Sequence, residues 1–178
     1  MLIGILGSAG SGKDTLADLI LEEVSSYKRY AFAGPIKRMI EAGFGLHPDI
    51  WDDRGAKESP IQGINQSPRY LAQTIGTEWG RELVHPDIWL LLAGQFIDNN
   101  PDTVITDVRF DNEASMILRR GGLLLEVLRD NNALAPDNAG HSSEGGISPH
   151  YGRFVVENNG TIDDLRAKAQ SVLAQYHD

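Results

Sequence analysis

The chain has 178 residues, contains no cysteine and carries a formal net charge of −9 at neutral pH. This length suits one domain with its own core, so residues 1–178 are expected to form a single domain. The lack of cysteine excludes disulfides and thiolate metal sites. The acidic charge argues against sequence-independent binding to a nucleic acid polymer. Because the sequence shows neither a bilayer-length apolar stretch nor a basic leader, we expect a cytoplasmic protein without membrane partners.

Short apolar runs alternate with helical periodicity along the chain, which is typical of an α/β protein with a parallel sheet. Strands are predicted at residues 2–6, 30–32, 104–106, 123–128 and 154–157. Helices are predicted around residues 16–24, 35–40, 67–79, 88–96, 114–118 and 161–176. The stretch 45–66 is rich in Pro, Gly, Asp and Asn, which predicts a partly irregular insertion. The loop at 130–151 is too long for a simple connection, and such loops are often lids.

The strongest functional signal is the glycine-rich segment at residues 7–15, which lies directly between the first strand and an amphipathic helix. Its glycines let backbone N–H groups turn inward around a phosphate, and the helix N-terminus adds its positive dipole end. Lys13 is placed to reach the β- and γ-phosphates of a nucleotide. An incidental glycine-rich turn would not explain both the spacing and the flanking elements. The segment predicts ATP binding by Gly7, Ser8, Gly10, Ser11, Gly12, Lys13, Asp14 and Thr15.

The residue after Lys13 departs from the usual phosphate-binding motif. The motif has Ser or Thr there, whose hydroxyl binds Mg²⁺, whereas this chain has Asp14 followed by Thr15. A carboxylate is also a hard oxygen ligand, so Asp14 is a candidate metal ligand, directly or through water. A side chain that points away from the metal is the open alternative. Thr15 is then placed to contact the α-phosphate.

A second candidate site follows the predicted strand at 104–106. A carboxylate at the carboxyl end of a buried strand lies where open α/β sheets bind ligands. Asp107 is therefore a candidate to orient Mg²⁺ or its water shell, and Arg109 to clamp a phosphate bidentately. The alternative is that Asp107 caps the helix that starts near Asp111.

Further cations stand near predicted loop mouths, namely Lys37, Arg69, Arg81 and Arg129. Each alone is typical of a solvated surface residue. Phosphoryl transfer, however, depends mostly on positioning and on neutralisation of charge. Beside a phosphate cradle, we therefore expect at least three of the four to line the site.

These residues together resemble the phage-type deoxynucleoside monophosphate kinases, within the wider P-loop nucleoside monophosphate kinase-like fold. The resemblance runs nearly end to end. It rests on GSAGSGKDT, FAGPIKRMI, SPRYLAQTIGTEWGREL with HPDIW, VITDVRF, HSSE and VVENNGT. The tandem of GKDT, GTEWGR and DVRF is specific, whereas HSSE alone would be weak.

The resemblance implies a three-layer fold with a parallel five-stranded sheet in the order 2-3-1-4-5. It also implies a monophosphate-binding region at about 33–100 and a mobile lid at about 130–151. The residues implied to face the monophosphate are Lys37, Arg69, Gln73, Trp79 and Arg81. The implied catalytic residues are Lys13, Asp107, Arg109 and Arg129, and the implied metal ligands are Asp14 and Asp107. Gly34 departs from the family, which more often has Asp there, so any hydrogen bond of that Asp is in doubt.

The implied activity is ATP- and Mg²⁺-dependent phosphorylation of a deoxynucleoside 5′-monophosphate to the diphosphate. The partners would be small nucleotides, a homodimer is compatible with the family, and the compartment would be the host cytoplasm for a viral protein. Phosphomevalonate kinases of the P-loop type share the GKD cradle and an arginine after the third strand, so they are the alternative within kinases. Dephospho-CoA kinases are disfavoured because Ser-Thr usually follows their lysine. A nucleotide-dependent switch is a further alternative, although it would need no arginine-bearing insertion.

Overall fold

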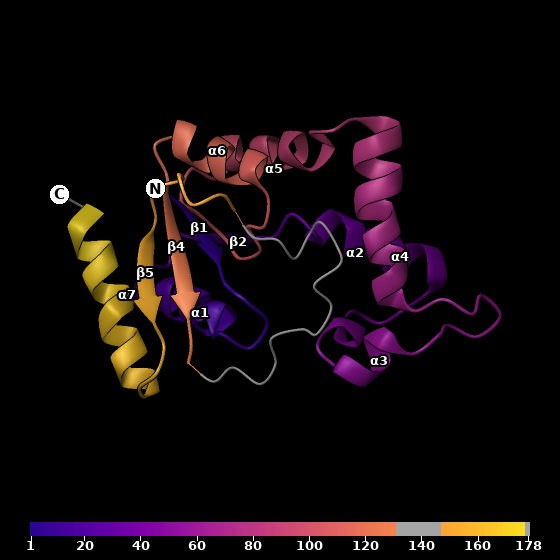
Figure 1. The fold of residues 1–178 in the computed structure, drawn as a ribbon, viewed down its shortest axis with the longest axis horizontal. Coiled ribbons are helices and arrows are strands. Elements are labelled where there is room, and N and C mark those ends of the chain that lie inside the picture. Colours follow the sequence, from indigo (N-terminus) through magenta and orange to yellow (C-terminus); the bar gives the residue numbers. More distant parts are fainter. Residues whose placement is uncertain (131–146, 177–178) are drawn as a thin grey trace. The chain divides into compact units, whose positions relative to one another are not determined.

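The computed structural model describes residues 1–130 and 147–176 (Figure 1). The chain divides into two compact units, the first made of Met1–Ala31 and Gly94–Asp178 and the second of Phe32–Ala93. The first unit contains the sheet, and the second is built from helical segments. In the part of the chain that the structure describes, no helix has the length and apolar character to cross a membrane.

Within the described residues, five parallel strands form one sheet in the order β2-β3-β1-β4-β5 (Figure 1). The strands are β1 (Leu2–Leu6), β2 (Lys28–Tyr30), β3 (Thr103–Ile105), β4 (Leu123–Leu128) and β5 (Phe154–Glu157). In the centre, Ile3 of β1 lies beside Val104 of β3 and Leu123 of β4. The predicted strand order is therefore confirmed.

The second strand begins earlier than predicted. It pairs with β3 over Lys28, Arg29 and Tyr30, and this ladder ends at Tyr30. The prediction of 30–32 was wrong because β2 lies at the edge of the sheet. There Lys28 and Arg29 are exposed, so the start of the strand carries no apolar signal.

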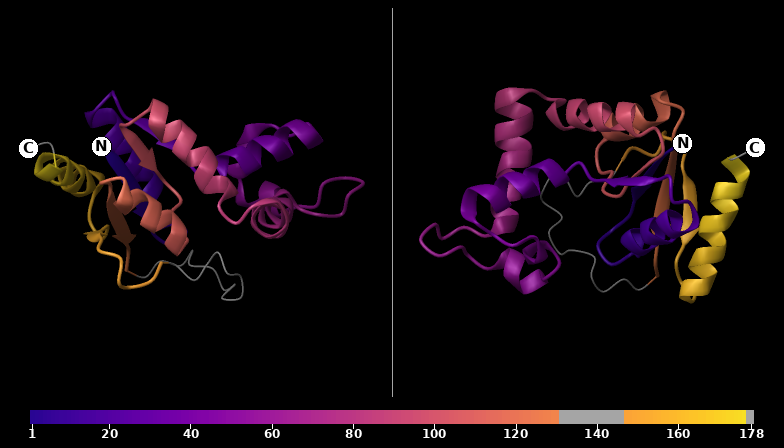
Figure 2. Two further views of the ribbon diagram at one scale, coloured as in Figure 1. Left: turned by 90° about the horizontal axis from the view of Figure 1, so that it is seen from above. Right: turned by 180° about the vertical axis from the view of Figure 1, so that it is seen from behind.

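Helices cover both faces of the sheet (Figure 2). On one face, α1 (Lys13–Glu23) and α7 (Ile162–Tyr176) pack together over Ile5 and Leu125. On the other face, α6 (Asp111–Arg119) packs on β1 and β4. Gly4 permits this approach, because a Cβ there would lie 2.6 Å from Cδ1 of Ile117. The three-layer arrangement that the sequence predicts is confirmed.

The second unit is a chain of short helical segments. These are α2 (Gly34–Phe44), η1 (Pro48–Trp51), α3 (Arg54–Glu58), α4 (Pro68–Thr74), η2 (Ile75–Val84) and the start of α5 (Ile88–Asn99). The helix start at Ser67-Pro68 is confirmed, since the Ser67 hydroxyl accepts a hydrogen bond from the Tyr70 N–H at 3.2 Å. The stretch 45–66 holds more regular structure than predicted, because η1 and α3 both lie in it.

A widened helix, η2, follows α4 directly. It is a π-helix of 10 residues, and the His85 N–H that ends it donates to the carbonyl of Gly80, five residues earlier, at 3.0 Å. Such helices are rare and are frequent at functional sites. The sequence predicts a helix as far as residue 79, but neither its continuation to Val84 nor its widening.

Candidate functional site

The phosphate cradle occupies the loop between β1 and α1. Gly10 and Gly12 adopt φ of +77° and +95°, values that side-chain-bearing residues rarely adopt. Gly12 is also the N-cap of α1, and a glycine cap brings no side chain to the free N–H groups of the first turn. These donors and the positive end of the helix dipole are the features that bind a phosphate. The loop therefore has the geometry that the sequence predicts for it.

The start of the cradle approaches its neighbours closely. Gly7 has φ +152°, and a Cβ there would lie 2.6 Å from the Ser11 hydroxyl oxygen and 2.7 Å from the Val127 carbonyl oxygen. Ser11 is fully buried, and its hydroxyl has no hydrogen-bond partner among the described residues. Its N–H donates to the Ser8 carbonyl at 3.2 Å. The Ser11 side chain is thus part of the loop's interior.

Asn158, the residue that follows β5, fastens the cradle to the sheet. Its side-chain amide donates to the Ser11 carbonyl at 2.8 Å, and its own N–H donates to the Leu128 carbonyl at 2.7 Å. A Cβ at Gly12 would lie 2.2 Å from the Asn158 amide nitrogen, so this contact requires glycine. This role was not predicted from the sequence. The available signal was an amide side chain at the carboxyl end of a strand, where α/β sheets bind ligands.

Lys13 and Asp14 open α1 next to each other. The Lys13 ammonium lies 3.4 Å from the Asp14 carboxylate, and the two side chains are 16% and 67% exposed. An ion pair with such an exposed carboxylate contributes little to stability. Lys13 can therefore leave Asp14 for a bound phosphate at small cost. The exposed Arg29 of β2 donates to the Asp14 carbonyl at 3.2 Å.

Asp107 lies at the same edge of the sheet as the cradle. The Thr106 N–H donates to the Tyr30 carbonyl at 3.1 Å, and the Val108 N–H donates to the Ile5 carbonyl at 3.2 Å. These bonds continue the sheet past the end of β3 and place Asp107 beside the end of β1. Asp107 is half-buried.

Arg109 is exposed, and its backbone is held by a buried carboxylate that was not predicted from the sequence. Glu113 is 1% exposed and accepts from the N–H groups of Arg109 and Phe110 at 2.8 and 3.1 Å. The sequence signal for this role is a Glu in the first turn of α6, where acidic side chains reach back to the free N–H groups.

Arg129 follows β4 directly and is also exposed. The cradle, Asp107, Arg109 and Arg129 therefore follow strands that end at one edge.

The predicted metal ligands fit Mg²⁺ by their chemistry. Asp14 and Asp107 are carboxylates, and Mg²⁺ is held in phosphoryl-transfer sites by one or two carboxylates together with substrate phosphates and water. Across residues 1–130 and 147–176, no three potential metal-ligating side chains gather in one group. The nucleotide itself would supply the remaining ligands.

The residues predicted to face the monophosphate lie in the second unit. Lys37 of α2 lies over the ring of Trp51, 5.4 Å from its centroid. Arg69 of α4 pairs with Glu58 at 3.1 Å. Arg81 of η2 donates to the Gly76 carbonyl at 3.2 Å. Gln73 is half-buried, and Trp79 is 40% exposed.

The predicted lid lies largely outside the described residues, which resume at Ile147. The HSSE segment falls there too. Ser148 is fixed to α6, because its N–H donates to the Asp111 carboxylate at 2.7 Å and its hydroxyl donates to the same group. These hydrogen bonds lower the pKa of Asp111 below its ordinary value.

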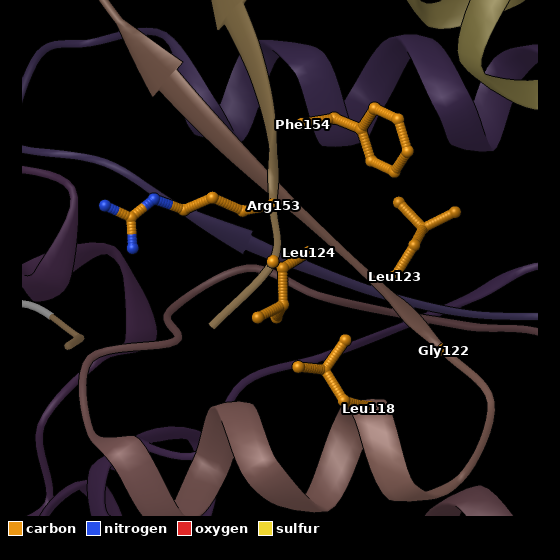
Figure 3. Close-up of a pocket in the computed structure, with 7 residues that line it drawn as sticks. Leu118, Gly122, Leu123, Leu124, Arg153 and Phe154 are labelled. Carbon is orange, nitrogen blue, oxygen red and sulfur yellow. The ribbon is translucent and has the colours of Figure 1, made fainter. Parts of the chain in front are cut away.

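A hollow of about 320 Å³ lies at the opposite edge of the sheet (Figure 3). It is lined by Leu118, Gly122, Leu123, Leu124, Gly152, Arg153 and Phe154. Arg153 points away from the leucines, and its Nε donates to Glu126 at 2.7 Å (Figure 3). The hollow adjoins the strand starts, so it does not belong to the cradle.

The family described as "Deoxynucleotide monophosphate kinase" matches residues 58–169. The chain belongs to this family. Its relatives include the deoxynucleoside-5′-monophosphate kinase of Escherichia phage T5, which is 30% identical over 85% of this chain and 86% of the phage protein. The identification of a phage-type kinase family from the sequence is therefore confirmed.

Solved structures of other proteins share the fold of this chain. TT1252 from Thermus thermophilus has a TM-score of 0.56 and 22% identity, over 99% of this chain and 97% of that protein. The dephospho-CoA kinase from Campylobacter jejuni has a TM-score of 0.52 and 13% identity, over 98% and 96% of the two chains. At these identities the likeness supports the fold alone.

Proposed function

We propose that this protein transfers the γ-phosphoryl group of ATP to a deoxynucleoside 5′-monophosphate. A phosphate oxygen of the acceptor attacks the γ-phosphorus, and the bond from that phosphorus to the β–γ bridging oxygen breaks. The products are ADP and the deoxynucleoside diphosphate. The observation that carries this proposal is the glycine cradle between β1 and α1, in a chain of the deoxynucleotide monophosphate kinase family.

The proposed roles on the ATP side follow from charge and position. The cradle's N–H groups hold the phosphates, and Lys13 neutralises charge on the β- and γ-phosphates. Arg109 and Arg129 act on the transferring phosphoryl, because a guanidinium can bridge two of its oxygens. Asp14 and Asp107 would hold Mg²⁺, which neutralises phosphate charge when bound.

The second unit is proposed to bind the acceptor. Its cations Lys37, Arg69 and Arg81 suit the phosphate of a nucleoside monophosphate. Gln73 supplies an amide for a base edge, and the exposed indole of Trp79 offers a face for stacking. We propose that both units act as one kinase domain, with the acceptor region at about 33–100 and a lid at about 130–151.

The proposed partners are therefore small nucleotides, not a nucleic acid polymer or a membrane. The net charge of −9 supports this choice, because polymer binding needs many lysines and arginines. The host cytoplasm is the proposed compartment, and a homodimer is compatible with the proposal.

A coupled assay of ADP release tests the proposal. ATP and Mg²⁺ are held constant while dTMP, dGMP, dCMP, dAMP and phosphomevalonate are supplied one at a time. We expect ADP release that depends on at least one deoxynucleoside monophosphate and little release without an acceptor. Release with phosphomevalonate alone would replace the proposed acceptor, and acceptor-independent release would indicate an ATPase or a nucleotide switch.

A further inference from the structure

Two lysines of the second unit are held by one tryptophan. The ammonium of Lys37 lies over the ring of Trp51, and the ammonium of Lys57 donates to the Trp51 carbonyl at 3.0 Å. The indole N–H of Trp51 donates to Glu41 at 2.6 Å, which fixes the ring. Trp51 ends η1, whereas Lys37 and Lys57 belong to α2 and α3. Trp51 thus holds the ammonium groups of Lys37 and Lys57, which come from two different helices.

Arg69 adds a third positive charge to this group. It lies on α4, which packs against both α2 and α3, and its guanidinium contacts Glu58, the neighbour of Lys57, at 3.1 Å. Only 33% of the Arg69 side chain is exposed. The cluster formed by Lys37, Lys57 and Arg69 is therefore built from three helices and fixed by packing.

The cations of the cluster lie close enough to act on one another. The pKa of Lys57 is lowered, first by burial and then by the positive charges of Lys37 and Arg69. Glu58 and Asp52 act in the opposite direction without restoring the ordinary value. Cations held together in this way favour an additional anion, which would offset their mutual repulsion.

We propose that Lys57 binds the phosphate of the acceptor nucleotide together with Lys37 and Arg69, an inference that rests on the proposed kinase function. Lys57 has three N–H donors, and the Trp51 carbonyl takes one of them. Two lysine ammonium groups supply compact charges, and Arg69 supplies a fork for two phosphate oxygens. A nucleoside monophosphate carries a charge of about −1.5 to −2 at neutral pH, which suits three cations. In this assignment Lys57 binds the acceptor phosphate and takes no part in the phosphoryl transfer itself.

The test replaces Lys57 by methionine, which keeps most of the stem and removes the charge. We expect the KM for the monophosphate to rise about 10- to 100-fold, the loss expected for a charge-assisted contact. The KM for ATP should stay within about twofold, because the ATP cradle is in the first unit. Lys57→Arg should restore part of the affinity. Lys28→Met, on the exposed edge strand β2, is the matched control and should change neither KM.

Two measurements distinguish a failure of the Lys57 assignment from a failure of the proposed kinase function. The unmodified protein must first show monophosphate-dependent ADP release, and its absence would overturn the proposed function itself. Calorimetric titration of dTMP or another accepted monophosphate, without ATP, then measures binding independently of turnover. A Lys57→Met protein with a lower melting temperature but parental affinity would assign Lys57 a structural role and overturn the inference.

Discussion

Trp89 and Arg81 donate to the same carbonyl oxygen, that of Gly76, at 2.8 and 3.2 Å. Trp89 is 1% exposed, and its ring fills the space beside Gly80, where a Cβ would lie 2.6 Å from it. Gly76 and Gly80 belong to η2, and Trp89 is the second residue of α5. The indole therefore holds the turn of the widened helix from which Arg81 projects.

Replacing Trp89 by phenylalanine should destabilise the protein and loosen Arg81. Phenylalanine keeps a six-membered ring but removes the pyrrole ring and its N–H to Gly76, so the free energy of unfolding should fall by about 1 kcal/mol for the hydrogen bond and further for the lost packing. Trp89→Leu leaves a larger cavity and should cost about 3 kcal/mol. Urea denaturation measures both, and kinetics should show a raised KM for the monophosphate with a normal KM for ATP. An unchanged denaturation midpoint in Trp89→Phe would show that the hydrogen bond does not stabilise η2.

Replacing Lys13 by alanine should lower kcat by orders of magnitude while leaving the fold intact. Lys13 neutralises charge that develops on the phosphates, and this effect is realised mainly in the transition state. Steady-state kinetics measures the loss, and the melting temperature checks the fold. Lys28→Ala, on exposed β2, serves as the control and should keep parental kinetics. Near-normal turnover by a folded Lys13→Ala protein would contradict the assignment.

The sheet and the cradle were predictable because their signals are local. The apolar run Leu2–Leu6 and the glycine spacing that follows it specify a strand, a phosphate loop and a helix start within fifteen residues. The capping pair at the start of α7 is equally local: the Thr161 N–H donates to the Asp164 carboxylate at 2.7 Å, and the Asp164 N–H donates to the Thr161 hydroxyl at 3.2 Å.

The features that were missed depend on contacts between distant residues. Asn158 reaches Ser11 from the last strand, so its partner is visible only in the folded chain. The widened helix η2 is contacted by Trp89, which packs beside Gly80 and donates to the Gly76 carbonyl from the next helix along the chain. Lys57 lies in a stretch predicted to be partly irregular, where no periodicity places its side chain beside another cation. Most of the site's cations could therefore be predicted from the sequence, but not the side chains and carbonyls that position them.

Replacing Asp14 by serine should retain activity and shift its Mg²⁺ dependence. Serine restores the hydroxyl that the common motif places after the lysine. Because a neutral hydroxyl attracts Mg²⁺ less than a carboxylate does, the Mg²⁺ concentration for half-maximal activity should rise. Titration of activity with Mg²⁺ at fixed ATP measures this, with Asp18→Ser on the same helix as the control. A titration identical to the parent's would show that Asp14 does not serve the metal.

The contact of Ser148 with Asp111 should make part of the stability depend on pH. Hydrogen bonds from Ser148 lower the pKa of Asp111 in the folded protein. The folded carboxyl therefore binds fewer protons, so its contribution is present above the ordinary value of 3.8 and is lost as pH falls through the lowered pKa. Ser148→Ala should reduce the free energy of unfolding at neutral pH but progressively less below pH 4. Ser171→Ala, exposed on α7, is the control. An equal effect of Ser148→Ala at all pH values would contradict this linkage.

Asn158→Ala should weaken ATP binding, because the Ser11 carbonyl loses its donor and the cradle loses its link to β5. We expect the KM for ATP to rise several-fold and the free energy of unfolding to fall by about 1 kcal/mol. Asn99→Ala is a matched control, since the Asn99 amide also donates to a backbone carbonyl, that of Gln95, at 2.8 Å. Asn99 is exposed on α5, so its loss should leave the KM for ATP unchanged.

Gly12→Ala tests the same contact from the other side. Alanine at φ +95° is strained by about 1 kcal/mol, and its Cβ would also lie 2.2 Å from the Asn158 amide. Gly12→Ala should therefore impair ATP binding more than Asn158→Ala does. In the double variant the clash is gone, whereas the backbone strain and the loss of the Asn158 hydrogen bond to Ser11 remain, so the total loss of affinity should be smaller than the sum of the two single losses. Titration calorimetry with ATP measures all three variants. Additive losses of ATP affinity in the double variant would show that the two residues act independently. The Asn158 amide would then not be what excludes a larger side chain at position 12.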